Sequence, residues 1–132
     1  MKSTNYFNTL ILVAEDCPTK TAIIPSKPGT IAAWQHALLS AAESLTSDDL
    51  LVAVTAHRRE VPADEWPDLR DDIFAKPQAC LRTSPLVKQF GWGLFHDEMG
   101  HVHLIAVDSP DYAALVGNPA ITKVRGMRSK RA

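Results

Sequence analysis

The sequence predicts a single α+β domain with a mainly antiparallel sheet. Its 132 residues, 45% of them hydrophobic, suit one domain that buries a core of its own. Some stretches alternate apolar and polar residues, as strands do, and others repeat apolar residues every three or four positions, as helices do. No repeat or linker divides the chain. We therefore expect one domain over residues 1–132, with one longer helix at about residues 30–45.

The first half of the chain predicts a strand, a loop, a helix and a second strand. Residues 5–14 alternate in hydrophobicity and predict a strand, and the prolines that follow favour a loop. Thr30 is a suitable N-cap for a helix that ends near Leu45. Residues 46–49 are turn-forming side chains. Residues 50–56 form a nearly continuous apolar run with two valines, which predicts a central strand.

The second half predicts short helices around a β-hairpin. A short helix over residues 67–74 carries acidic side chains, which we expect to be solvated. Strands over residues 92–96 and 101–107 are joined by four residues that end in glycine, as suits a hairpin turn. A last strand is expected within residues 120–127, after a further short helix.

Two copies of one capping pattern predict where short helices begin and end. Ser84-Pro85 is followed by Gly91, and Ser109-Pro110 is followed by Gly117. In each copy the serine suits the N-cap, the proline suits the first helical position, and the glycine suits a left-handed exit. We therefore expect two short connecting helices with Ser-Pro caps.

Three histidines of the hairpin are candidate metal ligands whose arrangement depends on strand register. If Gly100 forms a bulge, Asp97 opposes His101, so Asp97, His101 and His103 share one face and His96 points to the other. If the connection is a simple loop, all three histidines share a face. His-x-His on a strand can bind zinc or copper. Histidines near a hairpin tip are commonly solvated, so we predict no metal and no cofactor.

Cys80, Arg82 and Ser84 form a second candidate site. If residues 79–83 are extended, the three side chains project on the same side of the chain. Arg82 would then lie beside the first turn of the helix that Ser84 caps, where free N–H groups favour negative charge. This arrangement predicts an anion-binding site.

The two cysteines give an alternative, a thiol-dependent enzyme or redox protein. Cys80, or Cys17, would be the nucleophile or redox thiol, and His96 would act as the base. The competing interpretation is two inert thiols, because an isolated cysteine usually packs as a small apolar side chain. Cysteines 63 positions apart form neither a disulfide framework nor a zinc pattern, and we expect both to be reduced.

Trp92 is flanked by two glycines and is either a core anchor or the floor of a ligand cleft. In the leading functional hypothesis, Trp92 binds a ligand together with Arg82, Ser84 and Arg128. That hypothesis is a small soluble binding module for an anionic or polar small molecule.

Charge is distributed unevenly along the chain. Residues 1–122 hold nine basic and fifteen acidic side chains, whereas residues 123–132 hold five basic side chains and no acidic one. Such a basic segment can bind nucleic acid. Because no aromatic side chain lies between its charges, we consider nucleic acid the least favoured partner. No apolar run approaches the roughly 18 residues of a membrane helix, and no signal peptide is recognisable. We expect a cytoplasmic protein with no membrane partner.

The chain carries five distinctive segments, which are TNYFNTLILVAEDCP (residues 4–18), TSDDLL (46–51), ACLRTSPL (79–86), FGWG (90–93) and MRSKR (127–131). Together they resemble a family of small bacterial proteins catalogued only as a domain of unknown function. The resemblance spans nearly the whole chain and implies a stand-alone bacterial protein, without implying an activity, a cofactor or a partner. Both cysteines lie in matching segments. His101 and His103 depart from the family pattern, which argues against a metal site common to the family.

Overall fold

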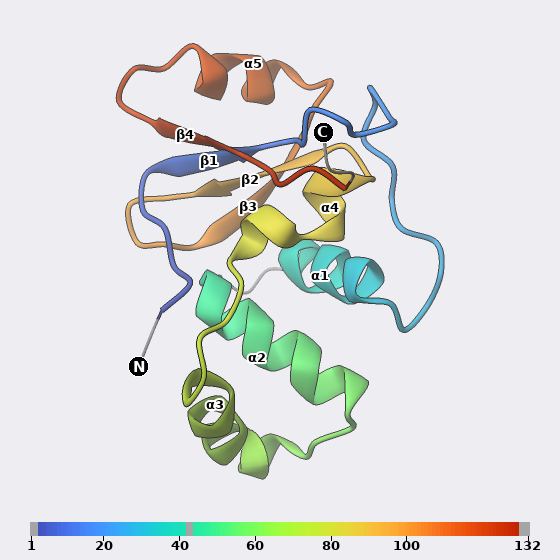
Figure 1. Ribbon diagram of the computed structural model, residues 1–132, viewed down its shortest axis with the longest axis vertical. Coiled ribbons are helices and arrows are strands. Elements are labelled where there is room, and N and C mark those ends of the chain that lie inside the picture. The colour runs from blue at the N-terminus through green and yellow to red at the C-terminus, as the bar shows by residue number, and fades with distance from the viewer. Residues whose placement is uncertain (1–2, 42–43, 130–132) are drawn as a thin grey trace.

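The computed structural model describes residues 3–41 and 44–129, and within them four strands form a single sheet (Figure 1). The strands are β1 (Thr9–Leu12), β2 (Trp92–His96), β3 (Val102–Ala106) and β4 (Thr122–Arg125). Their order is β3-β2-β1-β4, with β4 parallel to β1 and the other neighbouring pairs antiparallel. The predicted α+β fold with a mainly antiparallel sheet is therefore confirmed.

Helices cover both faces of the sheet. They are α1 (Ile31–Ser40), α2 (Ser47–Arg58), α3 (Trp66–Phe74), α4 (Pro85–Lys88) and α5 (Pro110–Val116), with two 3-10 turns, η1 (Ala63–Glu65) and η2 (Leu81–Thr83). Figure 1 shows α5 on one side of the sheet and α1, α2 and α4 on the other, with α3 beyond α2. Among the described residues, no helix is long and apolar enough to cross a membrane.

The main core lies between the sheet and the helices on its α1 side. The register pairs Ile11 with Leu94, so both side chains project from the same face, and both are fully buried. Leu50 of α2 and Leu86 of α4 belong to the same buried cluster. Leu10 projects from the opposite face because side chains alternate along a strand, and it is fully buried as well. Apolar residues on both faces of β1 explain its nearly continuous hydrophobic sequence.

Gly93 allows α5 to lie close to the second face of the sheet. A Cβ atom at this position would lie 2.7 Å from the ring of Tyr112, which is closer than carbon atoms approach. The Tyr112 hydroxyl accepts a hydrogen bond from the Val13 N–H at 3.1 Å, so the ring is held against the strands. A glycine at this position inside β2 is thus a packing requirement.

The predicted central strand at residues 50–56 is wrong, because these residues belong to α2. The Thr46 hydroxyl accepts a hydrogen bond from the Asp49 N–H at 3.1 Å, and the Asp49 carboxylate accepts one from the Thr46 N–H at 3.1 Å. Residues 46–49 are therefore a capping box that starts a helix. Most of the helix circumference is buried, so its apolar residues form a run without the polar gaps of an amphipathic helix.

The predicted end of the first helix near Leu45 is also wrong. Thr30 caps α1 as expected, but the helix ends at Ser40, and residues 42–43 lie outside the described part of the chain. The Leu45 carbonyl accepts a hydrogen bond from the Val102 N–H at 2.8 Å. Leu45 therefore continues the edge of the sheet beside β3, which is incompatible with a position inside a helix.

Residues 81–83 are not extended, so the alternative that aligned Cys80, Arg82 and Ser84 on one side of an extended segment over residues 79–83 is wrong. The Ser84 N–H donates to the Leu81 carbonyl at 3.0 Å, and the Thr83 hydroxyl donates to the Cys80 carbonyl at 2.9 Å. These local bonds form the η2 turn, in which side chains repeat every three residues instead of every two.

The two Ser-Pro caps are confirmed. The Ser84 hydroxyl accepts from the Leu86 N–H at 3.1 Å, and the Ser109 hydroxyl accepts from the Tyr112 N–H at 3.2 Å. The predicted left-handed exit after the second helix is wrong. Gly117 has φ −80°, because its N–H still bonds back to the Ala113 carbonyl and the chain continues in a right-handed turn.

The hairpin adopts the bulged register. Phe95 pairs with His103 and His96 pairs with Val102, while Gly100 has φ +82°, a value that glycine reaches without strain. The alternative with all three histidines on one face is therefore wrong. The predicted last strand is confirmed as β4.

We predict that Thr46→Ala lowers the free energy of unfolding by about 1 kcal/mol, because it removes the side-chain half of the capping box. Urea unfolding monitored by circular dichroism measures this change. Thr122→Ala on the exposed edge of β4 is the matched control and should have a smaller effect. Equal losses for the two variants would contradict the cap.

Candidate functional site

A cleft of about 810 Å³ lies between α1, α2 and the chain around η2. Several lining residues belong to α2. Four of them are spaced three or four positions apart and so lie on one side of the helix, namely Ser47, Leu51, Thr55 and Arg58. Within the described part of the chain, the lining consists of Thr4, Gly29, Ile31, Trp34, Gln35, Ser47, Leu51, Val54, Thr55, His57, Arg58, Arg59, Glu60, Gln78, Ala79, Cys80, Leu81, Thr83, Ser84 and Pro85.

Gln35 is the buried amide of this cleft, and Ser84 fixes its orientation. The Ser84 hydroxyl donates to the Gln35 side-chain oxygen at 2.6 Å while it accepts the capping bond from Leu86. Both side chains are buried. Among the described residues, the Gln35 amide nitrogen has no hydrogen-bond partner. This nitrogen is therefore a donor available to a ligand in the cleft.

An aromatic pair and basic side chains line the cleft around the C-terminal end of α2. The rings of Trp34 and His57 are stacked, with 4.3 Å between centroids and 9° between planes. Trp66 meets His57 edge-on at 5.6 Å. Arg58 and Arg59 are exposed, and the Arg58 Nε donates to the Gly29 carbonyl at 3.3 Å. These groups give this part of the cleft a flat apolar surface and positive charge.

Cys80 is the predicted thiol that does line the cleft. The Tyr6 hydroxyl donates a hydrogen bond to the Cys80 sulfur at 3.2 Å. Burial, and then this hydrogen bond, raise the pKa of Tyr6 to about 12, so the hydroxyl remains a proton donor at neutral pH. Because the Tyr6 O–H is the donor in this contact, the contact does not use the Cys80 S–H.

Cys17 lies in a different environment. It is half-buried in the loop after β1, and its sulfur is 3.6 Å from the Thr19 carbonyl, to which its S–H donates. Both cysteines are free thiols. Cys17 is not among the residues that line the cleft.

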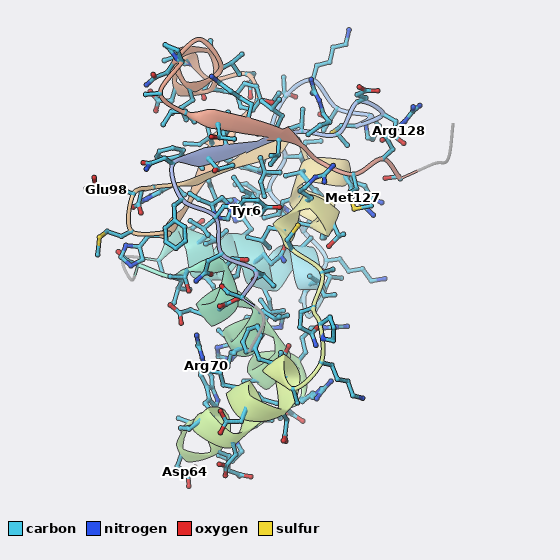
Figure 2. All side chains as sticks on the ribbon, turned by 60° about the vertical axis from the view of Figure 1, so that its left-hand side comes forward. Tyr6, Asp64, Arg70, Glu98, Met127 and Arg128 are labelled. Atoms are coloured by element: carbon cyan, nitrogen blue, oxygen red, sulfur yellow. The ribbon has the colours of Figure 1, made fainter. Side chains whose placement is uncertain are left out.

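Arg82, Trp92 and Arg128 lie outside the lining of the cleft and contact other parts of the protein. The Arg82 Nε donates to the Arg125 carbonyl at 2.7 Å, and the Arg82 carbonyl accepts from the Met127 N–H at 2.8 Å. Figure 2 shows Met127 and Arg128 on the opposite side of the molecule from Glu98 at the hairpin tip. The two hydrogen bonds of Arg82 attach the end of β4 and the chain that follows it to η2.

Trp92 and the basic segment also have partners within the protein. The Trp92 Nε1 donates to the Ile23 carbonyl at 2.8 Å, which holds the loop before α1. Arg128 lies 3.9 Å from the Glu15 carboxylate, and the Arg125 guanidinium donates to the Val13 carbonyl at 3.0 Å. Lys130 and Arg131 of the predicted basic segment lie outside the described residues.

His96 is buried in the core instead of facing a site. Its side chain is 0% exposed, and neither ring nitrogen has a hydrogen-bond partner among the described residues. The Tyr6 ring meets it edge-on with 5.3 Å between centroids. Burial lowers the pKa of His96 to about 4, so it is neutral at pH 7. A role as base for Cys80 has no direct contact to support it.

His101 and His103 instead organise the hairpin tip through Asp97. The Asp97 carboxylate accepts hydrogen bonds from the His103 Nε2 at 2.8 Å and from the N–H groups of Met99 and His101, each at 2.9 Å. Burial acts to raise the pKa of Asp97, but these bonds outweigh it and hold the pKa below its ordinary value. The described residues contain no group of three His, Cys, Asp or Glu side chains that could hold a metal.

Cys80 and Ser84 were predicted as site residues from the sequence, whereas the other polar residues of the cleft were not. Gln35 was a detectable signal, because it lies next to Trp34 on the apolar side of a predicted helix, where a polar side chain is unusual. Thr4 and Ser47 could not be found, because their proximity depends on the N-terminal segment meeting the start of α2.

We predict that His96 makes the protein acid-sensitive. Its pKa in the folded state, about 4, lies below the ordinary value of 6.5, so it stabilises the fold above pH 6.5 and loses this contribution as pH falls toward 4. The loss amounts to about 3 kcal/mol. His96→Phe should abolish this slope in urea unfolding between pH 7 and 4.

The exposed His103 provides the control for this slope. His103→Gln should retain the acid-side loss of stability, because the buried imidazole is still present. An unchanged slope in His96→Phe would show that another group is responsible.

Comparisons with known proteins agree with the resemblance in the sequence. The model of a family of unknown function, DUF6157, matches residues 1–132. A search of curated proteins and a search of solved structures each gave no match. Since the family model covers the whole sequence, the chain belongs to the DUF6157 family of unknown function.

Proposed function

We propose that the cleft binds a small molecule that presents a carbonyl or carboxylate oxygen to Gln35. The observation that supports this most directly is the Gln35 amide nitrogen, which lacks a protein partner among the described residues although most of the side chain is buried. This nitrogen is not among the fully buried atoms without a partner, so it is accessible from the cleft. A donor whose side chain is held in place by Ser84 can bond a ligand oxygen without first being ordered. The cleft volume, about 810 Å³, falls within the range of small-molecule sites, roughly 300–1,000 Å³.

The chemistry of the lining narrows the class of ligand. Cys80 supplies a further weak donor beside η2, since its sulfur accepts the Tyr6 bond. Among the described lining residues, Arg58 and Arg59 outnumber Glu60, so their net charge is positive. The stacked Trp34 and His57 rings add a flat surface. This combination favours a neutral or anionic compound with oxygen acceptors and a planar or apolar part.

The proposed binding site does not include Arg82 and Trp92, which the sequence had suggested. Arg82 instead binds the end of β4, and Trp92 binds the loop before α1. Binding at those residues remains a prediction. The proposed setting is the cytoplasm, where free thiols such as Cys17 and Cys80 stay reduced.

A thermal-shift screen of small carboxylic acids, amides and keto acids, followed by calorimetry of the strongest hit, tests the proposal. Gln35→Leu should weaken binding about ten-fold, as expected for the loss of one hydrogen bond. Ser84→Ala should weaken it as well, because Ser84 orients the amide.

Ser109→Ala is the matched control, because it removes the same kind of cap from α5, which does not line the cleft. It should leave the affinity unchanged. An affinity insensitive to Gln35→Leu, or no hit from these compound classes, would contradict the proposal.

A second candidate function, chemistry at the Cys80 thiol, is favoured by one observation. Cys80 combines a place in the cleft with a hydrogen bond from the Tyr6 hydroxyl to its sulfur. The absence of a direct base contact makes this candidate secondary to ligand binding.

If Cys80 is a reactive nucleophile, Tyr6→Phe should slow its reaction with iodoacetamide at pH 7.5 several-fold, since the thiolate loses its donor. Mass spectrometry of the Cys80 peptide measures the rate, and Cys17 in the same chain is the internal reference. Equal rates in wild type and variant would exclude activation by Tyr6.

A further inference from the structure

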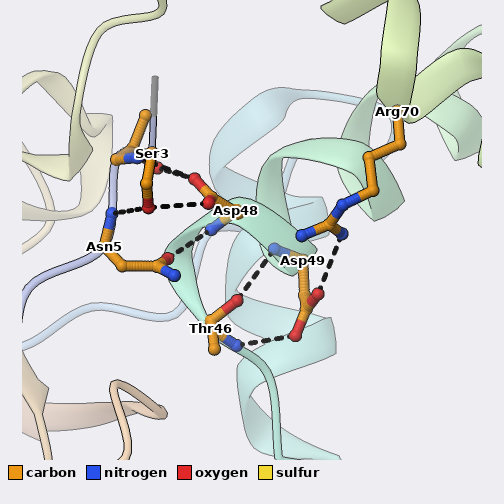
Figure 3. A network of polar contacts seen from close by, with 7 residues as sticks. Ser3, Asn5, Thr46, Asp48, Asp49 and Arg70 are labelled. Carbon is orange, nitrogen blue, oxygen red and sulfur yellow. Dashed lines mark hydrogen bonds and ion pairs between the residues drawn. The ribbon is translucent and has the colours of Figure 1, made fainter. Parts of the chain in front are cut away.

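The N-terminal segment, residues 3–6, is bound to the start of α2 through a buried carboxylate (Figure 3). Asp48 is 1% exposed. Its carboxylate accepts hydrogen bonds from the Ser3 hydroxyl, the Thr4 N–H and the Thr4 hydroxyl, all at 2.7 Å. In the other direction, the Asp48 N–H donates to the Asn5 side-chain oxygen at 2.9 Å. Four hydrogen bonds thus join one residue of α2 to three consecutive residues of the segment.

This segment contributes to the cleft in two ways. The Thr4 and Ser47 hydroxyls are 2.8 Å apart and both line the cleft; because the Thr4 hydroxyl donates to Asp48, Ser47 is the donor to Thr4. Tyr6, two residues further on, contacts the Cys80 sulfur. Asp48 itself does not line the cleft.

The neighbouring carboxylate has an unrelated role, which makes it a useful reference. Asp49 accepts hydrogen bonds from the Thr46 N–H and from Arg70 at 3.0 Å, and Figure 3 shows it turned away from the N-terminal segment. Burial acts to raise the pKa of Asp49, but the bonds from Thr46 and Arg70 outweigh it and hold the pKa below its ordinary value. Of the two adjacent aspartates, Asp49 therefore caps the helix and Asp48 binds the N-terminal segment.

We propose that residues 3–6 form a strap along one wall of the cleft, that Asp48 is the positioning residue that anchors it, and that release of the strap increases the exposure of the half-buried Cys80. Asp48 acts through Thr4, Ser47 and Tyr6. The strap is held by the hydrogen bonds at Asp48 and by the Tyr6 ring, which meets His96 edge-on and packs against the core. Loss of the Asp48 bonds releases its first residues as a local unit and weakens the hold on Tyr6. The inference deepens the proposed function, since it concerns access to the same cleft.

The test measures access to Cys80 in the free protein, so its result does not depend on whether a ligand is found. Asp48→Ala and Asp49→Ala are compared with wild type by the rate at which iodoacetamide labels the Cys80 peptide at pH 7.5. We expect Asp48→Ala to accelerate labelling at least about ten-fold, as loss of hydrogen bonds to a buried charged group should give. Asp49→Ala, which loses a cap and an ion pair, should leave the rate near that of wild type.

Two further measurements separate the strap from simpler explanations. Tyr6→Phe removes the hydroxyl donor but keeps the ring in place, so its rate must stay well below that of Asp48→Ala. Hydrogen exchange at the Thr4 amide should accelerate in Asp48→Ala and not in Asp49→Ala. If Asp48→Ala fails to fold by circular dichroism, Thr4→Val replaces it under the same criteria.

A rate for Asp48→Ala equal to that of wild type, of Asp49→Ala or of Tyr6→Phe would overturn the strap. Failure of the ligand screen together with accelerated labelling would instead refute the proposed function and leave the strap intact.

Discussion

A carboxylate with 1% exposure is costly unless its oxygens are hydrogen-bonded, and Asp48 meets this condition by binding a segment 44 positions away in the sequence. The position of Asp48 in the first turn of α2 also places its charge at the favourable end of the helix dipole. The Asn5 side chain satisfies the Asp48 N–H, one of the N–H groups that a helix start leaves without an internal partner. The first turn of α2 and the N-terminal segment therefore satisfy each other's polar groups.

Much of the remaining structure follows from this junction. The segment leads directly into β1, which pairs with both β2 and β4, so its placement sets the sheet against α2. On the other side, Leu45 receives the hydrogen bond of Val102, which attaches the chain just before α2 to the edge of β3. The start of α2 is thus connected to both an inner strand and an edge strand, and the cleft forms along the same helix.

The elements that could be predicted from sequence are those with local chemical causes. The Ser-Pro caps, the Thr30 cap and the hairpin depend on residues close together in the sequence, and each was predicted. The choice between the bulged register and a simple loop was left open by the sequence and is decided by the structure. The strand expected at residues 50–56 failed because a helix buried on most sides has no polar stripe, so its hydrophobic pattern resembles that of a buried strand. The capping box at Thr46 and Asp49 was the local signal that distinguishes a helix from a strand here.

The candidate site was only partly predictable, for a related reason. Cys80 and Ser84 stand out in the sequence as chemically distinctive residues near a helix start. The contacts from Ser84 to Gln35 and from Thr4 to Ser47 span 49 and 43 positions and depend on the packing of three elements. No local pattern contains that information.

The measurement that tests the central claim most directly is a double-mutant cycle between Asp48 and Thr4. Asp48→Asn, Thr4→Val and the double variant are compared with wild type by urea unfolding at pH 7. If the carboxylate holds the N-terminal segment as described, the coupling energy should be about 1–3 kcal/mol. Additive losses, with a coupling energy near zero, would contradict the account.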